Sequence, residues 1–146
     1  MQRFSAMDQT FSQLQEDDLA DLAAKREWVV GHYEPHAQHK YGSVEGKLAL
    51  LDAILGNQWV NPGETLKLQC LGIAFGDALA QQMDLAWVMV EDDYGRDAAL
   101  SLIGTSVLVF PQTMISKRIE DGEEIDIYEL LDGTRAIVRE ASERGS

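Results

Sequence analysis

The stretch WVMVEDDYGRDAAL, Trp87 to Leu100, sets four apolar side chains in a row and then places five charges within the next seven residues. The apolar run is short and rich in bulky and β-branched residues, which is typical of a buried strand. Gly95 can supply a positive φ, and Asp92 or Asp93 can hydrogen-bond the backbone of a turn. The stretch therefore predicts a strand, a tight acidic reversal over Glu91–Asp97, and a second strand paired to the first.

Two further apolar runs extend this pairing toward the carboxyl end. We expect strands at 85–90, 98–103 and 105–110, with Gly104 between the last two. Connections this short join antiparallel neighbours, because parallel strands need a crossover of a dozen or more residues. The three strands are therefore predicted to form an antiparallel meander.

Helical periodicity dominates the chain before this sheet. Apolar residues recur at helical spacing over 11–33, with Ser12 as a candidate cap, and 31–42 is the expected loop. A second helix is predicted from Ser43 to Gly56. A third begins with Asn61 as its cap and runs to Met83.

The third predicted helix is apolar around most of its axis, so we expect it to be central in the fold. Gly72 and Gly76 lie one turn apart on it and would let another backbone approach closely. A short helix is predicted at 112–120, and a last helix is predicted from Asp126 onward. The expected fold is one α+β domain over 1–146, with a three-stranded antiparallel meander packed against about five helices.

The charge balance bears on the class of partner. Twelve Lys and Arg residues against twenty-five Asp and Glu give a formal charge of −13, which disfavours direct binding of nucleic acid and anionic membranes. The charge can serve solubility alone, attract a basic protein partner or imitate a nucleic acid, and self-association stays open. Cys70 is the sole cysteine, so we expect a small buried hydrophobe in a cytoplasmic protein with no intramolecular disulfide.

Two groups of residues could bind a metal ion. The carboxylates of the hairpin are hard donors suited to Ca²⁺ or Mg²⁺, but a calcium loop that starts at Asp92 has Asp97 where glycine is needed and Ile103 where glutamate is needed. His32, His36 and His39 could bind a transition metal, but Pro35 interrupts their helical spacing. We expect a solvated turn and solvent-exposed histidines, and no cofactor or metal.

Three segments together resemble a bacterial family of uncharacterised proteins, domain of unknown function 3806. The segments are LGIAFGDAL at 71–79, WVMVEDDYGRDAAL at 87–100 and FPQTMISKRIEDGEEIDIYEL at 110–130. The resemblance implies a bacterial origin and a shared fold, and it transfers no mechanism. It nominates one candidate functional surface: Glu91, Asp92, Tyr94, Gly95, Asp97, Lys117 and Arg118.

Two functions from different classes follow from these observations. The first is a noncatalytic protein-binding or accessory domain of the immunity type, which would occupy a basic surface; no catalytic set of residues is recognisable in the sequence. The alternative is a metal-assisted hydrolase that uses the acidic hairpin from Glu91 to Asp97, with Glu91 or Asp97 as ligand or base. Whether the hairpin meets Lys117 and Arg118 is left open by the sequence.

Overall fold

The computed structural model describes residues 10–93 and 95–145. Its helices are α1 (Glu16–Val30), α2 (Val44–Gly56), α3 (Thr65–Met83), α4 (Met114–Glu120) and α5 (Ile127–Gly145), with two 3-10 helices, η2 (Pro35–Gly42) and η3 (Pro111–Thr113). Its strands are β1 (Thr10–Ser12), β2 (Leu85–Asp92), β3 (Gly95–Leu102) and β4 (Leu108–Val109). The predicted α+β class is confirmed.

The sheet holds the predicted meander and one addition. The described strands lie in the order β1-β2-β3-β4, and every neighbouring pair is antiparallel. In the β2–β3 hairpin, Trp87 lies opposite Leu100 and Asp92 opposite Gly95. Gly95 has a φ of 133°, which agrees with the turn expected from the sequence.

Helix α1 starts later in the chain than the sequence predicted. Residues 10–12 pair with β2 as a short edge strand, and α1 begins at Glu16. Gln15, and not Ser12, is the residue that caps α1, and its backbone N–H donates to Asp18 Oδ2 at 2.8 Å. The segment 31–42, which was expected to be a loop, is partly helical, because residues 35–42 form η2.

The α2 prediction is confirmed: the Gly46 N–H donates to the Ser43 hydroxyl at 2.9 Å. The predicted cap of α3 is wrong by several residues, because the helix begins at Thr65 and Glu64 takes the cap position. The Glu64 carboxylate instead accepts the backbone N–H of Asn61 at 2.9 Å. The third predicted strand shrinks to Leu108–Val109, since the Thr105 hydroxyl donates to Leu102 O and accepts from Val107 N in a turn.

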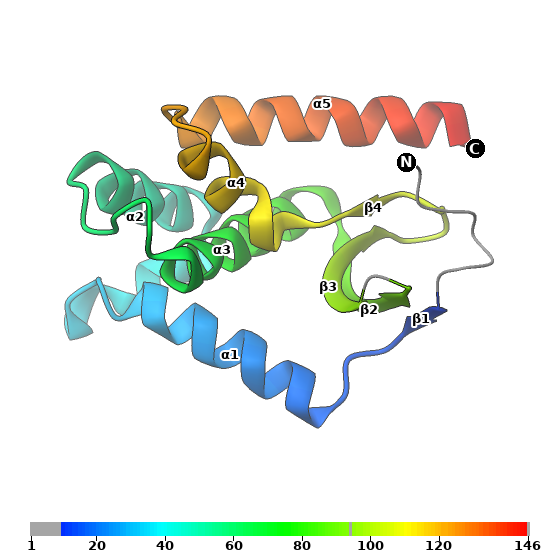
Figure 1. Ribbon diagram of the computed structural model, residues 1–146, viewed down its shortest axis with the longest axis horizontal. Helices are drawn as coiled ribbons and strands as arrows, with labels where there is room; N and C mark the ends of the chain where they lie inside the picture. The colour runs from blue at the N-terminus through cyan, green and yellow to red at the C-terminus, as the bar shows by residue number, and fades with distance from the viewer. Residues whose placement is uncertain (1–9, 94, 146) are drawn as a thin grey trace.

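Helix α3 is the centre of the fold, as its apolar sequence predicted. It contacts α1, α2, α4, α5, η3 and β2, and it supplies more of the fully buried side chains than any other described element, Phe75 among them. In Figure 1, α1 and α5 lie along opposite sides of the molecule, and the sheet lies at one end. None of the described helices is both long and apolar enough to cross a membrane.

The two glycines of α3 admit the chain segment after β4. A Cβ on Gly72 would lie 2.4 Å from the backbone oxygen of Gln112, and a Cβ on Gly76 would lie 2.7 Å from Pro111 Cγ. Both distances are too short for any side chain at these positions. The close backbone approach predicted from the glycine spacing is therefore confirmed, and it fixes η3 on α3.

Candidate functional site

The acidic hairpin is partly neutralised within the fold. Arg96 on β3 forms two hydrogen bonds with the carboxylate of Asp18 on α1, one of them from Nη2 to Oδ2 at 2.8 Å. Arg96 also lies directly opposite Glu91 in the strand register. The hydrogen bond to Arg96 is the main reason why the pKa of Asp18 falls from 3.8 to about 2. The ion pair between Arg96 and Asp18 thus helps to hold the sheet against α1.

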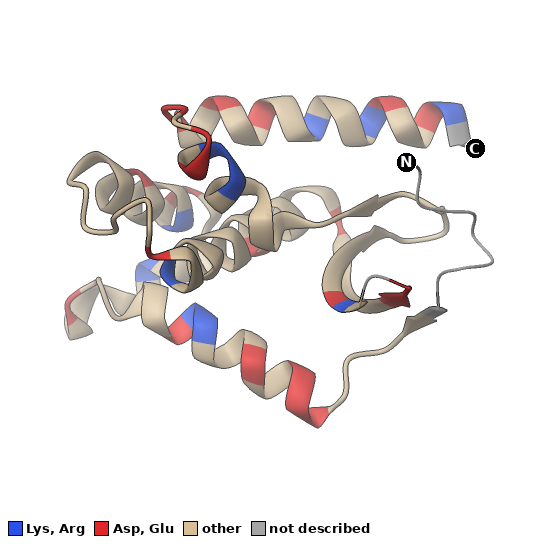
Figure 2. Cartoon of the chain, viewed as in Figure 1, with Lys and Arg blue, Asp and Glu red and all other residues tan. Residues whose placement is uncertain are grey.

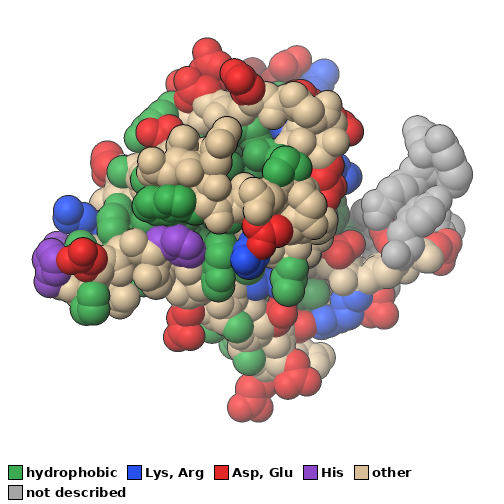
Figure 3. Space-filling view, turned by 60° about the vertical axis from the view of Figure 1, so that its left-hand side comes forward, with side chains coloured by type: hydrophobic (Ala, Val, Ile, Leu, Met, Phe, Trp, Pro, Cys, Tyr) green, Lys and Arg blue, Asp and Glu red, His purple; other side chains and the backbone are tan. Residues whose placement is uncertain are grey.

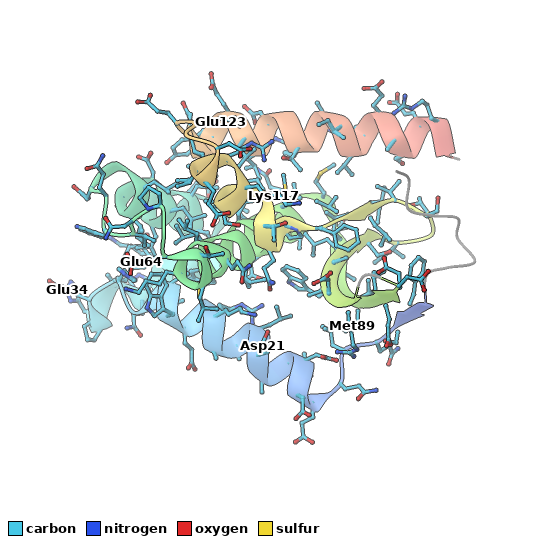
Figure 4. All side chains as sticks on the ribbon, in the orientation of Figure 1. Asp21, Glu34, Glu64, Met89, Lys117 and Glu123 are labelled. Carbon is cyan, nitrogen blue, oxygen red and sulfur yellow. The ribbon has the colours of Figure 1, made fainter. Side chains whose placement is uncertain are left out.

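The candidate surface nominated by the sequence is spread over two regions. Glu91, Gly95 and Asp97 are exposed at the hairpin, and Tyr94 lies outside the described residues. Lys117 and Arg118 are on α4, where Lys117 is exposed and Arg118 donates to Met114 O at 3.0 Å. Figure 4 shows Lys117 well apart from Met89 on β2. These positions do not form one compact site.

The two candidate metal sites lack converging ligands. Over residues 10–93 and 95–145, no three His, Cys, Asp or Glu side chains are placed to hold one metal ion. His32 Nδ1 lies 2.9 Å from Trp28 O and can donate to it. His36 and His39 are exposed on η2, and His36 Nδ1 lies 3.6 Å from a carboxylate oxygen of Glu34. The geometry of these described histidines gives a zinc site no support.

Cys70 packs as the sequence predicted. Its side chain is buried in the core beside α3 neighbours such as Leu71. Burial raises the pKa of the Cys70 thiol, which keeps it protonated and a poor nucleophile at neutral pH.

A buried polar network centres on Asp77 of α3. The Asp77 carboxylate accepts Arg26 Nε at 2.5 Å and Nη2 at 2.9 Å, the Tyr41 hydroxyl at 2.7 Å and Trp87 Nε1 at 3.1 Å. Burial, followed by the charge of Asp77, raises the pKa of Tyr41, so the phenol stays protonated as a donor. One carboxylate therefore joins α1, η2 and β2 to α3.

Lys47 extends the network on its η2 side. It is 7% exposed, its Nζ donates to Gln81 Oε1 at 2.6 Å, and it lies 4.8 Å from the centre of the Tyr41 ring. Burial lowers the pKa of Lys47. Gln81 donates in turn to Gly42 O at 3.0 Å. Since each group contacts another part of the fold, we assign this network to stability.

Asp77 is not among the candidate residues drawn from the sequence, because it stands as a single carboxylate on a helix that is apolar around most of its axis. A single carboxylate on a helix that is apolar around its axis is itself a signal, since a buried charge requires partners. The partners come from Arg26, Tyr41 and Trp87, which lie 51, 36 and 10 residues away along the chain. Their identity depends on the tertiary fold.

A groove of about 550 Å³ lies between the end of α2, the segment 58–62 and the connection from α4 to α5. Its apolar wall is built by Leu55, Val60, Ile119 and Ile125. Asp52, Glu123 and Glu124 add three exposed carboxylates, and no Lys or Arg is among the residues that line it. We call this surface the acidic groove. Figure 2 shows acidic residues, coloured red, gathered on the α4–α5 connection.

The acidic groove is framed by ordered contacts. The Thr65 hydroxyl at the start of α3 donates to the Glu120 carboxylate at the end of α4, at 2.6 Å. The Glu123 N–H donates to Arg118 O at 2.9 Å, which orders the connection after α4. These hydrogen bonds hold the backbone segments that carry the apolar wall and the carboxylates of the groove. The arrangement suits a side chain with an apolar stem and a cationic end, as lysine and arginine have.

Comparison with solved structures shows the same fold in a protein from Bacteroides thetaiotaomicron VPI-5482, whose crystal structure was determined at 1.50 Å resolution. The two superpose with a TM-score of 0.71 at 14% sequence identity, over 86% of this chain and 47% of that chain. This chain therefore spans about half the length of that protein. No curated protein matches the sequence.

The resemblance drawn from the sequence is confirmed by a family model. The model matches residues 47–130, a span that includes most of α2, all of α3, the β2–β3 hairpin and every residue that lines the acidic groove. On this match the chain belongs to the DUF3806 family, described as a domain of unknown function.

Proposed function

We propose that this domain is a noncatalytic protein-binding module that receives a basic segment of its partner in the acidic groove. An accessory protein of the immunity type, which covers a basic surface, would act in this way. The observation that carries the proposal is the groove itself, which three acidic residues line together with an apolar wall and which no basic residue lines. The net charge of −13 supports it, because an acidic surface accelerates encounter with a basic partner.

The hydrolase alternative draws less support from the same geometry. A metal-assisted mechanism at the hairpin would need several oxygen ligands converging on one ion. Arg96 is held there by Asp18, and its positive charge stands opposite Glu91. A bound cation would have to compete with this guanidinium. We therefore place the partner at the acidic groove and treat the hairpin as the comparison surface in the test.

The test uses two variants with the same change in net charge. The groove variant carries Asp52→Asn, Glu123→Gln and Glu124→Gln, and the hairpin variant carries Glu91→Gln, Asp93→Asn and Asp97→Asn. Each removes three negative charges, so each moves the net charge from −13 to −10. Any difference between the two then reports on position and not on overall charge.

The probe is a labelled hexa-arginine peptide, and its affinity is measured by fluorescence anisotropy at low and at physiological salt. We expect the groove variant to bind about tenfold more weakly, since three partly exposed ion pairs contribute roughly 0.5 kcal/mol each. The hairpin variant should bind within about twofold of the wild type. Equal weakening in both variants, or no binding by the wild type at low salt, would contradict the proposal.

A further inference from the structure

A second groove borders the acidic groove, and its wall includes an exposed aromatic ring. Trp59 is 52% exposed and stacks on His32, with ring centres 6.0 Å apart and planes inclined by 18°. His32 meets Trp28 edge-on at 4.6 Å, and its Nδ1 is within hydrogen-bond distance of Trp28 O. The exposed indole is therefore held in one place by a ring that is itself held by α1.

The backbone also fixes Trp59. After α2 the Gln58 N–H donates to Leu55 O at 3.2 Å and the Trp59 N–H donates to Ile54 O at 3.1 Å. Gln58 adopts the left-handed conformation, with a φ of 56°. This is the Schellman arrangement that ends many helices, although glycine usually takes the left-handed position. A large exposed tryptophan thus follows a residue in the left-handed conformation, and tryptophan is one of the residue types enriched among binding hot spots.

The second groove, of about 580 Å³, lies between Trp59, His32 and the exposed side of α2. We call it the aromatic groove. Ala49 and Ala53 supply its apolar floor on α2, and Lys40 and Glu45 contribute opposite charges at its margin. Figure 3 shows hydrophobic side chains gathered on one face of the molecule with acidic side chains beyond them. The aromatic groove is suited to an apolar side chain and not to a charged one.

One short segment separates the two grooves. Gln58 and Val60 line the acidic groove, and Trp59 between them lines the aromatic groove. Helix α2 contributes to both, through Asp52 on one side and Ala53 on the other. The stretches of α2 that line the two grooves are centred about 8 Å apart along the helix axis, at a rise of 1.5 Å per residue. Two or three residues of an extended peptide cover that distance at about 3.3 Å each.

We infer that the aromatic groove is the second half of the partner site and binds an apolar side chain of the same basic segment. The inference rests on the proposed function, because the charge of the acidic groove is what selects the occupant. The partner chemistry is thus a leucine-like or aromatic side chain placed two or three residues from an arginine or lysine. Trp59 forms the wall that the apolar side chain covers, and the cationic side chain reaches the carboxylates beyond Val60.

The test compares the affinities of labelled peptides for the full chain. One carries arginines alone, and the others add a leucine separated from the nearest arginine by two residues or by eight. With the two-residue spacing we expect leucine to strengthen binding about tenfold, which corresponds to partial burial of its side chain. With the eight-residue spacing the gain should largely disappear. Trp59→Ala should remove the gain, so that this variant binds the leucine peptide and the arginine-only peptide with the same affinity.

Two further variants keep the test decisive. Leu66→Ala removes another exposed apolar side chain, 67% exposed and outside both grooves, and should leave the leucine gain intact. Trp59→Phe keeps an aromatic ring and should restore part of the gain if Trp59→Ala loses it. Circular dichroism confirms that each variant is folded.

The outcomes separate this inference from the proposed function. If the arginine-only peptide binds through the acidic groove but leucine adds nothing, or if the gain survives Trp59→Ala, the inference is wrong and the proposed function stands. If the arginine-only peptide does not bind, the proposed function fails first. Light scattering tests whether a second copy of this chain occupies the aromatic groove. A dimer that Trp59→Ala dissociates would show that it does, and this result would also overturn the inference.

Discussion

Replacing Asp77 with asparagine should destabilise the protein strongly without changing the volume of the core. The carboxylate accepts four hydrogen bonds, two from Arg26 and one each from Tyr41 and Trp87, and its side chain is only 10% exposed. An asparagine keeps one acceptor oxygen and places an NH₂ group against the remaining donors. Arg26 then loses its counter-charge while its side chain stays mostly enclosed.

The magnitude follows from the exposure of the two partners. Breaking a fully buried ion pair by removing one member costs about 3–5 kcal/mol. Arg26 is 33% exposed and can turn part of its guanidinium toward water, so we expect a loss of about 2–4 kcal/mol in the free energy of unfolding. Tyr41→Phe removes a single donor and should cost about 1 kcal/mol.

The assay is urea unfolding followed by far-ultraviolet circular dichroism. Asp52→Asn is the matched control, because it makes the same chemical change on an exposed helical position and should stay within about 0.5 kcal/mol of the wild type. A loss below about 1 kcal/mol for Asp77→Asn would refute the reasoning. It would mean that the network is solvated and does not join α1, η2 and β2 to α3.

Two further predictions concern the ion pair between the hairpin and α1 and the close contact between α3 and η3. The pKa of Asp18 is lowered from 3.8 to about 2 chiefly by its hydrogen bond with Arg96, so this pair adds stability that is fully present above about pH 4 and lost as pH falls toward 2. Urea midpoints should therefore fall more steeply over that range in the wild type than in Arg96→Gln; parallel curves would contradict the pairing. Gly72→Ala should destabilise the fold by about 1–3 kcal/mol, because its Cβ meets the backbone of η3, whereas Gly133→Ala on α5 meets nothing within 4 Å and should stabilise by about 0.5–1 kcal/mol. Thermal unfolding measures whether each variant is more or less stable than the wild type. An unchanged stability of Gly72→Ala would show that η3 can move away from α3.

The parts of the fold that local pattern controls could be predicted from the sequence. Apolar periodicity gave α2 and the central position of α3, and the strand–turn–strand pattern around Gly95 gave the β2–β3 hairpin with its paired strands. The spacing of Gly72 and Gly76 predicted a close backbone contact, which the η3 segment makes. In each case the predictive pattern lies within one short segment of the chain, although the partner in the Gly72 contact, residues 111–112, is distant in the sequence.

Other features depend on distant partners and could not be predicted in the same way. Residues 10–12 carry too few apolar side chains to indicate a strand, and they form β1 because β2 offers an unpaired edge to them. Asn61 has the residue type of a helix cap, but the Glu64 carboxylate binds its N–H and α3 starts later. The acidic groove joins residues that are distant in the chain, such as Asp52 and Glu123.

The most direct test of the account is an NMR titration of the isotope-labelled protein with the arginine peptide that carries leucine at the two-residue spacing. The account predicts the largest amide shift changes over residues 52–62 and 119–125, with the Trp59 indole signal among them. Changes centred on the hairpin residues Glu91–Asp97, with the α2 and α4–α5 signals unmoved, would contradict it.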